Sequence, residues 1–397
     1  MKLLVFGSVY PRHDSDSEVP WLRETVRRLH SAGVDVEVMA PSWRGLKNHQ
    51  IDSIRVHRFR YAPVRWEWLT HDEGAPSKVA KSFWMRVIAL FYLICGTVAL
   101  FRIVRREQYD LIHVHWPFPH ALMAYPTKLL LHKKLILNFH GAELLLVKKF
   151  PWVAPLLRFA IRRADGIIVN SSFTAEKVKS LSPCQVQVIP YGSTLRNSAK
   201  RATPFTSLPW RILFVGRHIE RKGITYLIES LAHLKEREKW QLRIVGEGDL
   251  TQQLQQQANS SPYANQILFT GKLTTQELEA EYSAASLFVL PAIVDSKGDT
   301  EGLGVVLIEA VESGLPLVAS RVGGIVDVVL DGESGLLVDE KEPAQLAAAF
   351  ERLSEDPDLR VVLTQQAEKR CAQFFNWERV VQELIALYRQ TLNSSAE

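Results

Sequence analysis

Residues 300–310 read Thr300-Glu301-Gly302-Leu303-Gly304-Val305-Val306-Leu307-Ile308-Glu309-Ala310, and no other stretch says as much about the fold. Its two glycines precede an apolar run, which predicts a tight turn whose backbone N–H groups open onto the start of a helix. Glu309 then falls inside that helix among apolar neighbours. A buried carboxylate is costly unless a partner satisfies it. A pair of ribose hydroxyls is such a partner, so the stretch indicates a nucleotide site.

Short apolar runs alternate with longer helical patterns along the whole chain, the pattern of doubly wound α/β domains. Strands are predicted at residues 3–6, 34–40, 111–115, 135–139, 166–169 and 187–189, and again at 211–215, 241–245, 266–270, 287–290, 317–319 and 335–338. Helices are predicted at residues 21–31, 226–236, 276–284, 305–312, 342–354 and 378–392. The two halves therefore read as one Rossmann-like architecture built twice.

The polar, aperiodic stretch at residues 196–209 separates the two series. It contains Pro204 and Pro209, which interrupt regular structure. We expect a linker here, with a first domain at residues 1–195 and a second at 210–372.

Length and composition are those of a folded chain with two cores. The chain has 397 residues, of which 47% are hydrophobic and 9% aromatic. Its three cysteines (Cys95, Cys184 and Cys371) are far apart, which predicts neither a disulfide framework nor a zinc site and favours a reducing compartment. The apolar run at residues 1–7 is too short for a signal peptide and reads as a first strand, so we expect a cytoplasmic protein.

The charge is unevenly distributed between the halves. The net charge is +5, but residues 1–200 carry 29 Lys and Arg against 15 Asp and Glu, whereas the remaining residues are acidic overall. A basic first half indicates an anionic neighbour for that half alone. Nucleic acid, an anionic membrane face and a phosphorylated acceptor fit this charge equally well.

Residues 87–101 form the longest uncharged stretch, framed by Arg86 and Arg102. Fifteen residues fall short of the ~20 that a membrane-spanning helix needs. We favour a buried or groove-lining helix over an interfacial helix, and a membrane span least. Nearby aromatic and basic side chains, including Trp66, Trp84 and Arg105, support the interfacial alternative.

Five short motifs follow one another in the second half. They read Phe214-Val215-Gly216-Arg217-His218-Ile219-Glu220-Arg221-Lys222-Gly223, Ile244-Val245-Gly246-Glu247-Gly248, the stretch from Glu301 to Glu309, Val322-Gly323-Gly324 and Asp331-Gly332-Glu333-Ser334-Gly335. Each is weak alone, but the set in this order is highly specific. On these residues the chain resembles family 4 of the retaining glycosyltransferases, with the two glutamates as its E-x7-E motif. The resemblance covers nearly the whole length.

This resemblance implies the GT-B fold, in which two Rossmann-like doubly wound domains face a central cleft. The second domain would hold a nucleotide-sugar donor and the first an acceptor. Residues 373–397, with Asn376-Trp377-Glu378, resemble the family's terminal helix, which crosses back onto the first domain.

Donor-site residues are expected in the second domain. Arg217 and Lys222 follow a predicted strand, at the carboxyl edge where open α/β sheets bind ligands, and two cations there neutralise a departing diphosphate. By resemblance Glu309 accepts from the ribose hydroxyls and Glu301 faces the transferred sugar. The remaining donor-binding residues are expected to be Gly246, Leu303 and Gly304, with the last two offering backbone amides to the phosphates. The family more often has an aromatic residue where Leu303 stands.

In the first domain His140 is the strongest candidate for a catalytic residue. It ends a predicted strand, and by resemblance it lies near the sugar's anomeric centre as a catalytic residue beside Glu301, Arg217 and Lys222. His113, His115 and His120 are expected to be core or groove residues, because a metal site would need further ligands.

The loop after the first strand departs from the family pattern. It lacks the paired glycines of many relatives and offers Tyr10-Pro11-Arg12-His13, so Arg12 is a candidate for contact with acceptor or donor phosphate. Asp14-Ser15-Asp16 has the spacing of a metal motif from the other, GT-A, glycosyltransferase class, but its place predicts a solvated loop. Gly192 is expected to supply a backbone turn at the hinge.

The resemblance implies a metal-independent retaining transferase without a cofactor. It would move a sugar from a UDP- or GDP-sugar to an acceptor hydroxyl, with the leaving phosphate taking the acceptor's proton. The basic first half favours a lipid-linked acceptor in surface polysaccharide assembly, at an anionic membrane surface on the inner face of the plasma membrane, and we expect no nucleic-acid partner. The alternatives are a nucleotide-sugar epimerase of the same fold and a non-catalytic nucleotide-sugar-binding protein.

Overall fold

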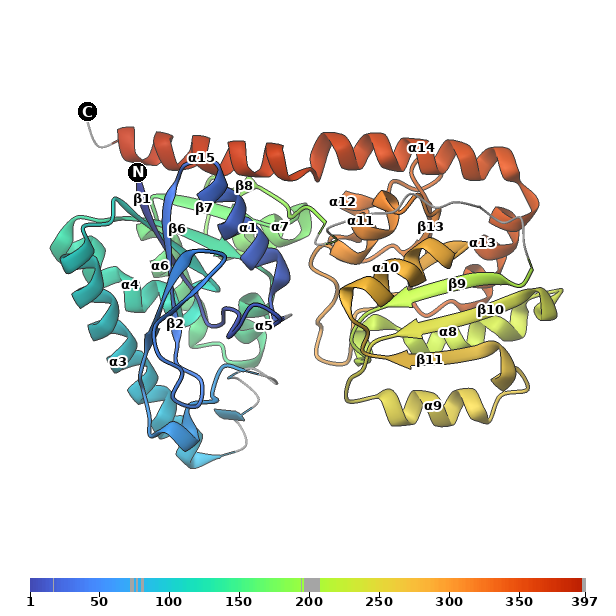
Figure 1. Ribbon diagram of the computed structural model, residues 1–397, viewed down its shortest axis with the longest axis horizontal. Coiled ribbons are helices and arrows are strands. Elements are labelled where there is room, and N and C mark those ends of the chain that lie inside the picture. Colours follow the sequence, from blue (N-terminus) through green and yellow to red (C-terminus); the bar gives the residue numbers. More distant parts are fainter. Residues whose placement is uncertain are drawn as a thin grey trace. The chain divides into compact units, whose positions relative to one another are not determined.

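The computed structural model divides the chain into two compact units (Figure 1). It describes residues 1–394 except 17, 72–74, 76–77, 80–81, 194 and 196–207. The first unit comprises Met1–Asn170, Thr174–Ile189 and Trp377–Glu397, and the second comprises Ser171–Phe173 and Pro190–Asn376. Most of the predicted linker, residues 196–207, lies outside the described residues.

An eight-stranded sheet forms the first unit. Its strands are β1 (Lys2–Phe6), β2 (Asp35–Pro41), β3 (His49–Ile51), β4 (Ile54–Phe59), β5 (Leu111–His115), β6 (Lys134–Phe139), β7 (Gly166–Val169) and β8 (Gln187–Val188). They lie in the order β3-β4-β2-β1-β5-β6-β7-β8, and every pair is parallel except β3 with β4. The six strands predicted from apolar runs are confirmed, and this order is that of a doubly wound domain.

The hairpin of β3 and β4 was not predicted. Its turn residues, Asp52 and Ser53, both have left-handed backbone angles, with φ of 50° and 66°. Such a two-residue turn ordinarily carries Asn-Gly or Asp-Gly, so a turn without glycine gives little sequence signal.

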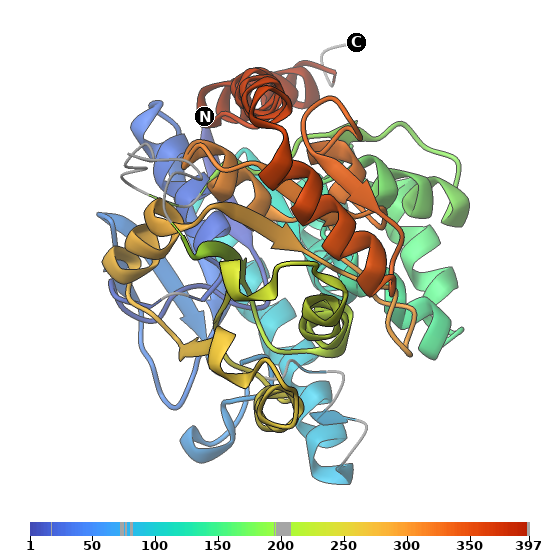
Figure 2. The same ribbon diagram turned by 90° about the vertical axis from the view of Figure 1, so that its right-hand side faces the viewer.

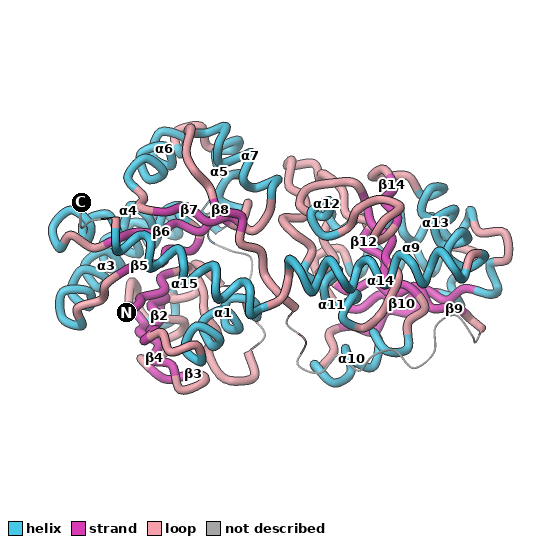
Figure 3. The backbone as a smooth tube through the Cα atoms, turned by 90° about the horizontal axis from the view of Figure 1, so that it is seen from above, coloured by secondary structure: helices cyan, strands magenta, loops and turns pink. Residues whose placement is uncertain are grey.

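Helices cover both faces of this sheet. They are α1 (Pro20–Ser31), α3 (Phe83–Glu107), α4 (Pro117–Leu131), α5 (Ala142–Lys149), α6 (Val153–Arg163), α7 (Ser172–Leu181) and α15 (Trp377–Asn393). The C-terminal helix α15 packs beside α1 (Figure 3). Two side-chain contacts fix it there: the Arg28 guanidinium lies 5.4 Å from the Trp377 ring centre, and the Tyr388 hydroxyl lies 2.8 Å from His113 Nδ1.

Helix α3 is longer than the uncharged stretch predicted it to be. It has 25 residues and continues through both flanking arginines, so the expectation that it is too short to cross a membrane is wrong. Length and composition alone would allow a span, and a third of its most apolar window is buried. One face packs into the core of the unit, where Gly96 lets Met123 of α4 and Phe59 of β4 approach closely.

The second unit repeats the architecture with six parallel strands. These are β9 (Trp210–Val215), β10 (Trp240–Val245), β11 (Ile267–Gly271), β12 (Leu287–Leu290), β13 (Leu317–Ser320) and β14 (Leu336–Val338), in the order β11-β10-β9-β12-β13-β14. All six were predicted. Strands β9, β12, β13 and β14 are near-continuous apolar runs, as expected for strands buried on both faces, whereas β10 alternates apolar residues with Gln241 and Arg243 and β11 is only partly buried.

The helices of this unit are α8 (Ile224–Ser230), α9 (Thr251–Asn259), α10 (Thr275–Ala284), α11 (Val305–Glu312), α12 (Ile325–Val328), α13 (Pro343–Glu355) and α14 (Pro357–Phe374). Helices α8 and α9 pack against each other and are seen end-on in Figure 2. The predicted helix at residues 226–236 is instead α8 followed by one 3-10 turn, Leu231–His233, and α14 was not predicted.

Glycines of the sequence motifs mark places where two loops touch. A Cβ atom on Gly324 would lie 2.0 Å from the Gly302 carbonyl oxygen, and the Gly324 amide donates to the Glu301 carbonyl over 2.9 Å. The turn at residues 322–324 therefore supports the loop that precedes α11. No side chain fits between them.

Substituting Gly324 tests this contact. Gly324→Ala should lower the free energy of unfolding by about 3 kcal/mol, because the added methyl group overlaps a backbone carbonyl. Gly332→Ala is the matched control: its φ is +70° and nothing lies within 4 Å of the added atom, so only the strain of about 1 kcal/mol applies. Urea unfolding measures both, and equal losses would contradict the packing described.

Candidate active site

The topological switch point of the second sheet lies between β9 and β12. These strands are neighbours, and the chain leaves β9 toward β10 on one side and leaves β12 toward β13 on the other. In open α/β sheets the loops at the carboxyl ends of two such strands diverge and leave a binding crevice. Here these loops are residues 216–223 and 291–304.

A backbone contact fastens the two loops together. The Ile293 amide donates to the Arg221 carbonyl over 2.9 Å. A Cβ atom on Gly223 would lie 1.8 Å from the Pro291 carbonyl oxygen, so only glycine fits there. The 3-10 turn Glu220–Lys222 consequently presents its cations to the second loop.

Glu301 receives two of these cations. Its Oε2 lies 3.0 Å from a guanidinium nitrogen of Arg221 and forms a shorter ion pair with the ammonium group of Lys222. Arg221 also reaches Asp299, at 3.4 Å. The predicted residues Lys222 and Glu301 thus lie in contact. Arg221 joins them in the same ion-pair cluster, although the sequence indicated only that it lies in a charged loop.

Burial and the neighbouring charges shift the pKa values of this cluster in opposite directions. Burial alone would raise the pKa of Glu301, but the charges of Lys222 and Arg221 lower that pKa to about 2. Burial lowers the pKa of Lys222, and Glu301 opposes that shift. The two groups depend on each other, since a buried charge without its partner is strongly destabilising.

Arg217 lies on the same loop with its side chain exposed. Among the described residues it has no ion-pair partner. Its guanidinium therefore keeps its full hydrogen-bonding capacity for an anion, as predicted for a phosphate-binding residue.

Glu309 lies in α11 and is buried, as the sequence predicted. The Tyr282 hydroxyl of α10 donates to its Oε2 over 3.0 Å. Sequence reasoning named ribose hydroxyls as the partner that would satisfy this carboxylate and missed the tyrosine. No sequence pattern links residues on different helices, so Tyr282 gave no signal.

The remaining predicted donor residues are backbone positions. Gly304 has a φ of +87° and precedes the first turn of α11, so the start of that helix opens onto the loop at residues 291–304. The Leu303 side chain is buried, which leaves only its backbone for a ligand. A Cβ on Gly246 would lie 2.1 Å from the Gly216 carbonyl oxygen, so Gly246 lets the loop after β10 pack against the loop of Arg217.

In the first unit His140 follows β6 and its ring belongs to an aromatic cluster. His140 Nε2 lies 3.1 Å from His115 Nδ1, and its ring centre lies 4.7 Å from that of Trp21 and 4.9 Å from that of Trp116. His115 neighbours His113, with ring centres 4.3 Å apart, and Tyr388 binds His113 from α15. Tyr388, His113, His115 and His140 thus form a row of contacting side chains from the C-terminal helix to the predicted catalytic histidine.

His113, His115 and His120 are buried, and His140 is half-buried. Burial lowers the pKa of His113 and of His140 to about 3, and lowers the pKa of His120 to about 4. His113, His115 and His120 are core residues, as predicted. The low pKa of His140 favours its neutral imidazole, which can donate or accept a hydrogen bond.

Glu143 is a further buried group that sequence reasoning missed. Its Oε1 accepts from the His140 amide over 2.7 Å, which fixes the turn between β6 and α5. Burial raises its pKa to about 7. Its position in the first turn of a helix, where acidic side chains are favoured, is the signal that could have revealed it.

Arg12 forms an ion pair within its own loop. Its Nε lies 2.6 Å from Asp16 Oδ2 and its NH2 lies 3.1 Å from Asp16 Oδ1. Although burial opposes ionisation, hydrogen bonds from Arg12 lower the pKa of Asp16 to about 2. Asp16 is buried, so the prediction of a solvated loop is wrong for this residue. Contact between Arg12 and a phosphate stays a prediction.

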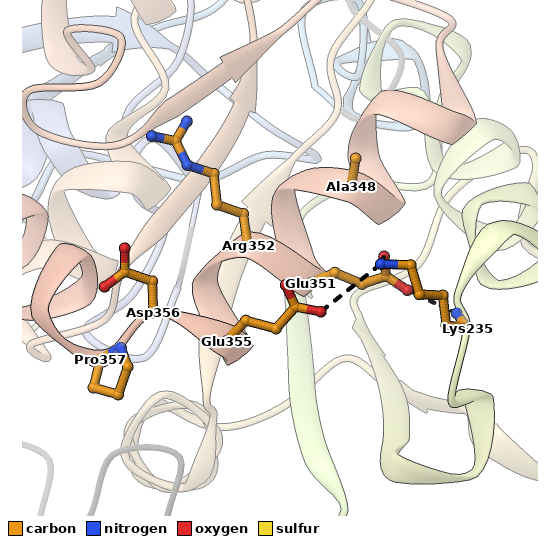
Figure 4. Close-up of a pocket in the computed structure, with 7 residues that line it drawn as sticks. All are labelled: Lys235, Ala348, Glu351, Arg352, Glu355, Asp356 and Pro357. Atoms are coloured by element: carbon orange, nitrogen blue, oxygen red, sulfur yellow. Dashed lines mark hydrogen bonds and ion pairs between the residues drawn. The ribbon is translucent and has the colours of Figure 1, made fainter.

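No group of three or more His, Cys, Asp or Glu side chains in the described part of the chain is arranged to hold a metal ion. An open hollow of about 500 Å³ lies in the second unit (Figure 4). It is lined by Lys235, Ala348, Glu351, Arg352, Glu355, Asp356 and Pro357. No predicted site residue lines it, and Lys235 is paired with Glu351 at 3.3 Å, so it is not the candidate site.

Comparison with known families agrees with the two units. Residues 196–370 match the family described as "Glycosyl transferases group 1", and residues 21–195 match "Glycosyltransferase Family 4".

Two relatives illustrate the range of similarity. The chain is 30% identical over 263 residues to the putative colanic acid biosynthesis glycosyltransferase WcaL of Salmonella typhimurium, covering 65% of this chain and 64% of the relative. It is 36% identical over 242 residues to a GDP-mannose-dependent alpha-(1-6)-phosphatidylinositol monomannoside mannosyltransferase of Mycolicibacterium smegmatis, covering 57% and 62%.

Solved structures share the fold. The sucrose-phosphate synthase of Thermosynechococcus elongatus aligns with a TM-score of 0.79 at 21% identity, over 99% of this chain and 100% of that one. Anabaena HepE in complex with UDP aligns with a TM-score of 0.72 at 18% identity, over 99% and 100%. At such identities the likeness establishes the fold, which is the GT-B fold.

The neutral histidines predict acid sensitivity. A histidine whose folded pKa lies below its unfolded value of about 6.5 stabilises the fold above pH 6.5, and this stability is lost as the pH falls. For His120, with a folded pKa of about 4, the loss between pH 7.5 and 5.5 is about 1.3 kcal/mol.

His120→Gln, which keeps hydrogen-bonding groups for Tyr92 and Trp116, should remove this part of the pH dependence. Denaturant unfolding at the two pH values measures it. The shifted pKa of Glu143 acts in the opposite sense but is common to both proteins, so it cancels in the comparison. An unchanged pH dependence in the variant would contradict the assignment.

Proposed function

Because the chain belongs to the glycosyl transferases group 1 family, we propose that it transfers a sugar from a UDP- or GDP-sugar to an acceptor hydroxyl with retention of anomeric configuration. The observation that carries the proposal is the cluster at the switch point of the second sheet. There Glu301 lies between Lys222 and Arg221, and Arg217 stands on the same loop. In the proposed reaction this cluster receives the donor's diphosphate.

The charges of the cluster suit a diphosphate. Arg221 and Lys222 pair with the carboxylates of Glu301 and Asp299, Arg217 adds a third cation on the same loop, and burial raises the pKa of Asp299. A positive excess is therefore left for an entering anion. Cations fixed where negative charge develops lower the barrier to departure of the nucleoside diphosphate. This is the basis for proposing a reaction without a metal ion or other cofactor.

Each remaining residue has a role in this proposal. Lys222 moves its hydrogen bonds from Glu301 to the diphosphate, which releases the Glu301 carboxylate to bind hydroxyls of the transferred sugar. Glu309 accepts from the ribose, and the amides of Leu303 and Gly304 donate to phosphate oxygens. His140, neutral and held by His115, hydrogen-bonds near the reacting carbon. The acceptor's proton passes to the leaving phosphate.

We further propose a lipid-linked acceptor at the inner face of the plasma membrane. Two observations support it: the basic character of residues 1–200, and relatives named for colanic acid biosynthesis and for a phosphatidylinositol mannoside. An acceptor anchored in lipid brings its anionic headgroup to the protein together with its sugar. The cysteines, all of them free thiols, suit the cytoplasmic side.

A thermal-shift series tests the donor site. UDP or GDP at 100 times its dissociation constant should add ~2.7 kcal/mol to the free energy of unfolding. ADP at the same concentration should add less. Lys222→Met and Arg217→Met should each weaken binding by about 10- to 100-fold, because each removes a charge-assisted hydrogen bond. Lys235→Met, in the unrelated hollow, is the matched control. The proposal fails if no nucleotide stabilises the protein or if the control weakens binding equally.

A substitution of Glu301 distinguishes nucleotide binding from catalytic turnover. Glu301→Gln should lower kcat at least 100-fold, because the carboxylate that orients the sugar is lost. UDP affinity should be unchanged or increased, because Lys222 no longer has to break an ion pair with a carboxylate before it binds the phosphates. Equal losses in affinity and kcat would assign Glu301 to nucleotide binding instead.

Nucleotide release distinguishes the alternatives. A transferase releases nucleoside diphosphate in proportion to added acceptor. An epimerase of the same fold interconverts nucleotide-sugars without acceptor, and a binding protein turns over nothing. The cluster of three cations supports an enzyme over a binding protein, since departure of a diphosphate develops the charge that they neutralise.

A further inference from the structure

The outer face of α3 is apolar although the fold leaves it uncovered. Six of its side chains are between 42% and 69% exposed. We call them the outer stripe: Phe83, Trp84, Leu90, Phe91, Ile94 and Val98. Isolated exposed apolar residues need no explanation, but a contiguous patch marks a surface for interaction.

Helix geometry confirms that the stripe is one surface. At 100° per residue its members fall within an arc of about 120°, and Phe83 to Val98 span about 22 Å. The buried residues Ile88, Tyr92, Gly96 and Leu100 lie on the opposite side. The helix is therefore apolar on two faces, and the core of the unit covers only one.

Positive charge frames the outer stripe. Arg86 stands near its beginning and Arg102, Arg105 and Arg106 follow its end, all of them exposed. Residues 83–106 contain no Asp or Glu. The first acidic side chain after this stretch, Glu107, is bound by Arg106 at 2.9 Å and by Lys2 at 3.4 Å. Among the residues that the structure describes, the other three arginines have no ion-pair partner.

The packing of the inner face decides how α3 meets a membrane. The Tyr92 hydroxyl is hydrogen-bonded to His120 of α4 over 2.8 Å, and Gly96 lies against Phe59 and Met123. A transmembrane position would expose the sheet and strip these contacts from the helix. Lying in the plane of the interface would preserve them and bury only the outer stripe.

We propose that the outer stripe of α3 docks this protein onto an anionic lipid bilayer. The apolar side chains enter the boundary between headgroups and acyl chains, Trp84 anchors at that depth, and the arginines bind lipid phosphates. In a parallel pairing with a second copy of the chain the arginine clusters would meet, whereas lipid phosphates neutralise them. The inference deepens the proposed function by placing the transferase on the surface that carries a lipid-linked acceptor.

Vesicle flotation without nucleotide or acceptor tests the proposal. The protein should float with vesicles of phosphatidylcholine and phosphatidylglycerol, and much less with phosphatidylcholine alone. Leu90→Asp with Phe91→Asp should lower partition at least 10-fold. The matched control is Val361→Asp with Val362→Asp on α14, where both valines are about half exposed, at 53% and 51%.

The stabilisation by UDP should be the same in both double variants, which shows that each is folded. Because docking and nucleotide binding are measured separately, failure of one leaves the other standing. The proposal is overturned if the α3 variant floats like the unaltered protein or if anionic lipid makes no difference. It is also overturned if the outer stripe holds a dimer in solution that the α3 variant separates.

Discussion

The ion pair between Lys222 and Glu301 is the constraint on which the candidate site depends. Each side chain is largely enclosed, with 9% of Lys222 and 13% of Glu301 exposed, and enclosing either charge alone would be strongly unfavourable. The pair therefore holds the loop after β9 against the loop after β12, with Arg221 as a second tie. In the proposed function an entering diphosphate replaces Glu301 as the partner of Lys222, so one contact would link the stability of the empty site to recognition of the donor.

The first unit repeats the architecture with different chemistry. Where the second unit gathers charges, the first buries a row of neutral histidines that runs from Tyr388 through His113 and His115 to His140. The C-terminal helix thus supports the side chain proposed to act near the reacting sugar. On its outer side the same unit exposes the apolar face of α3, which none of its described elements covers.

Sequence reasoning reached the fold because most strands of both sheets are nearly continuous apolar runs separated by helical patterns. It missed features without such a signal: the β3–β4 turn has no glycine, and α14 exposes Val361 and Val362, which breaks its helical periodicity. It also placed Lys222 and Glu301 in one site from their motifs. The partners Tyr282, Arg221 and Asp16 could not be predicted, because pairing across elements depends on packing that no local pattern records.

The most direct measurement is a crystal structure of the protein with UDP or a non-hydrolysable UDP-sugar. The account predicts the diphosphate against Lys222 and Arg217, the ribose hydroxyls on Glu309, and Lys222 shifted from Glu301 toward the phosphates. A nucleotide bound elsewhere, for example in the hollow beside Lys235, with the Lys222–Glu301 pair intact, would contradict it.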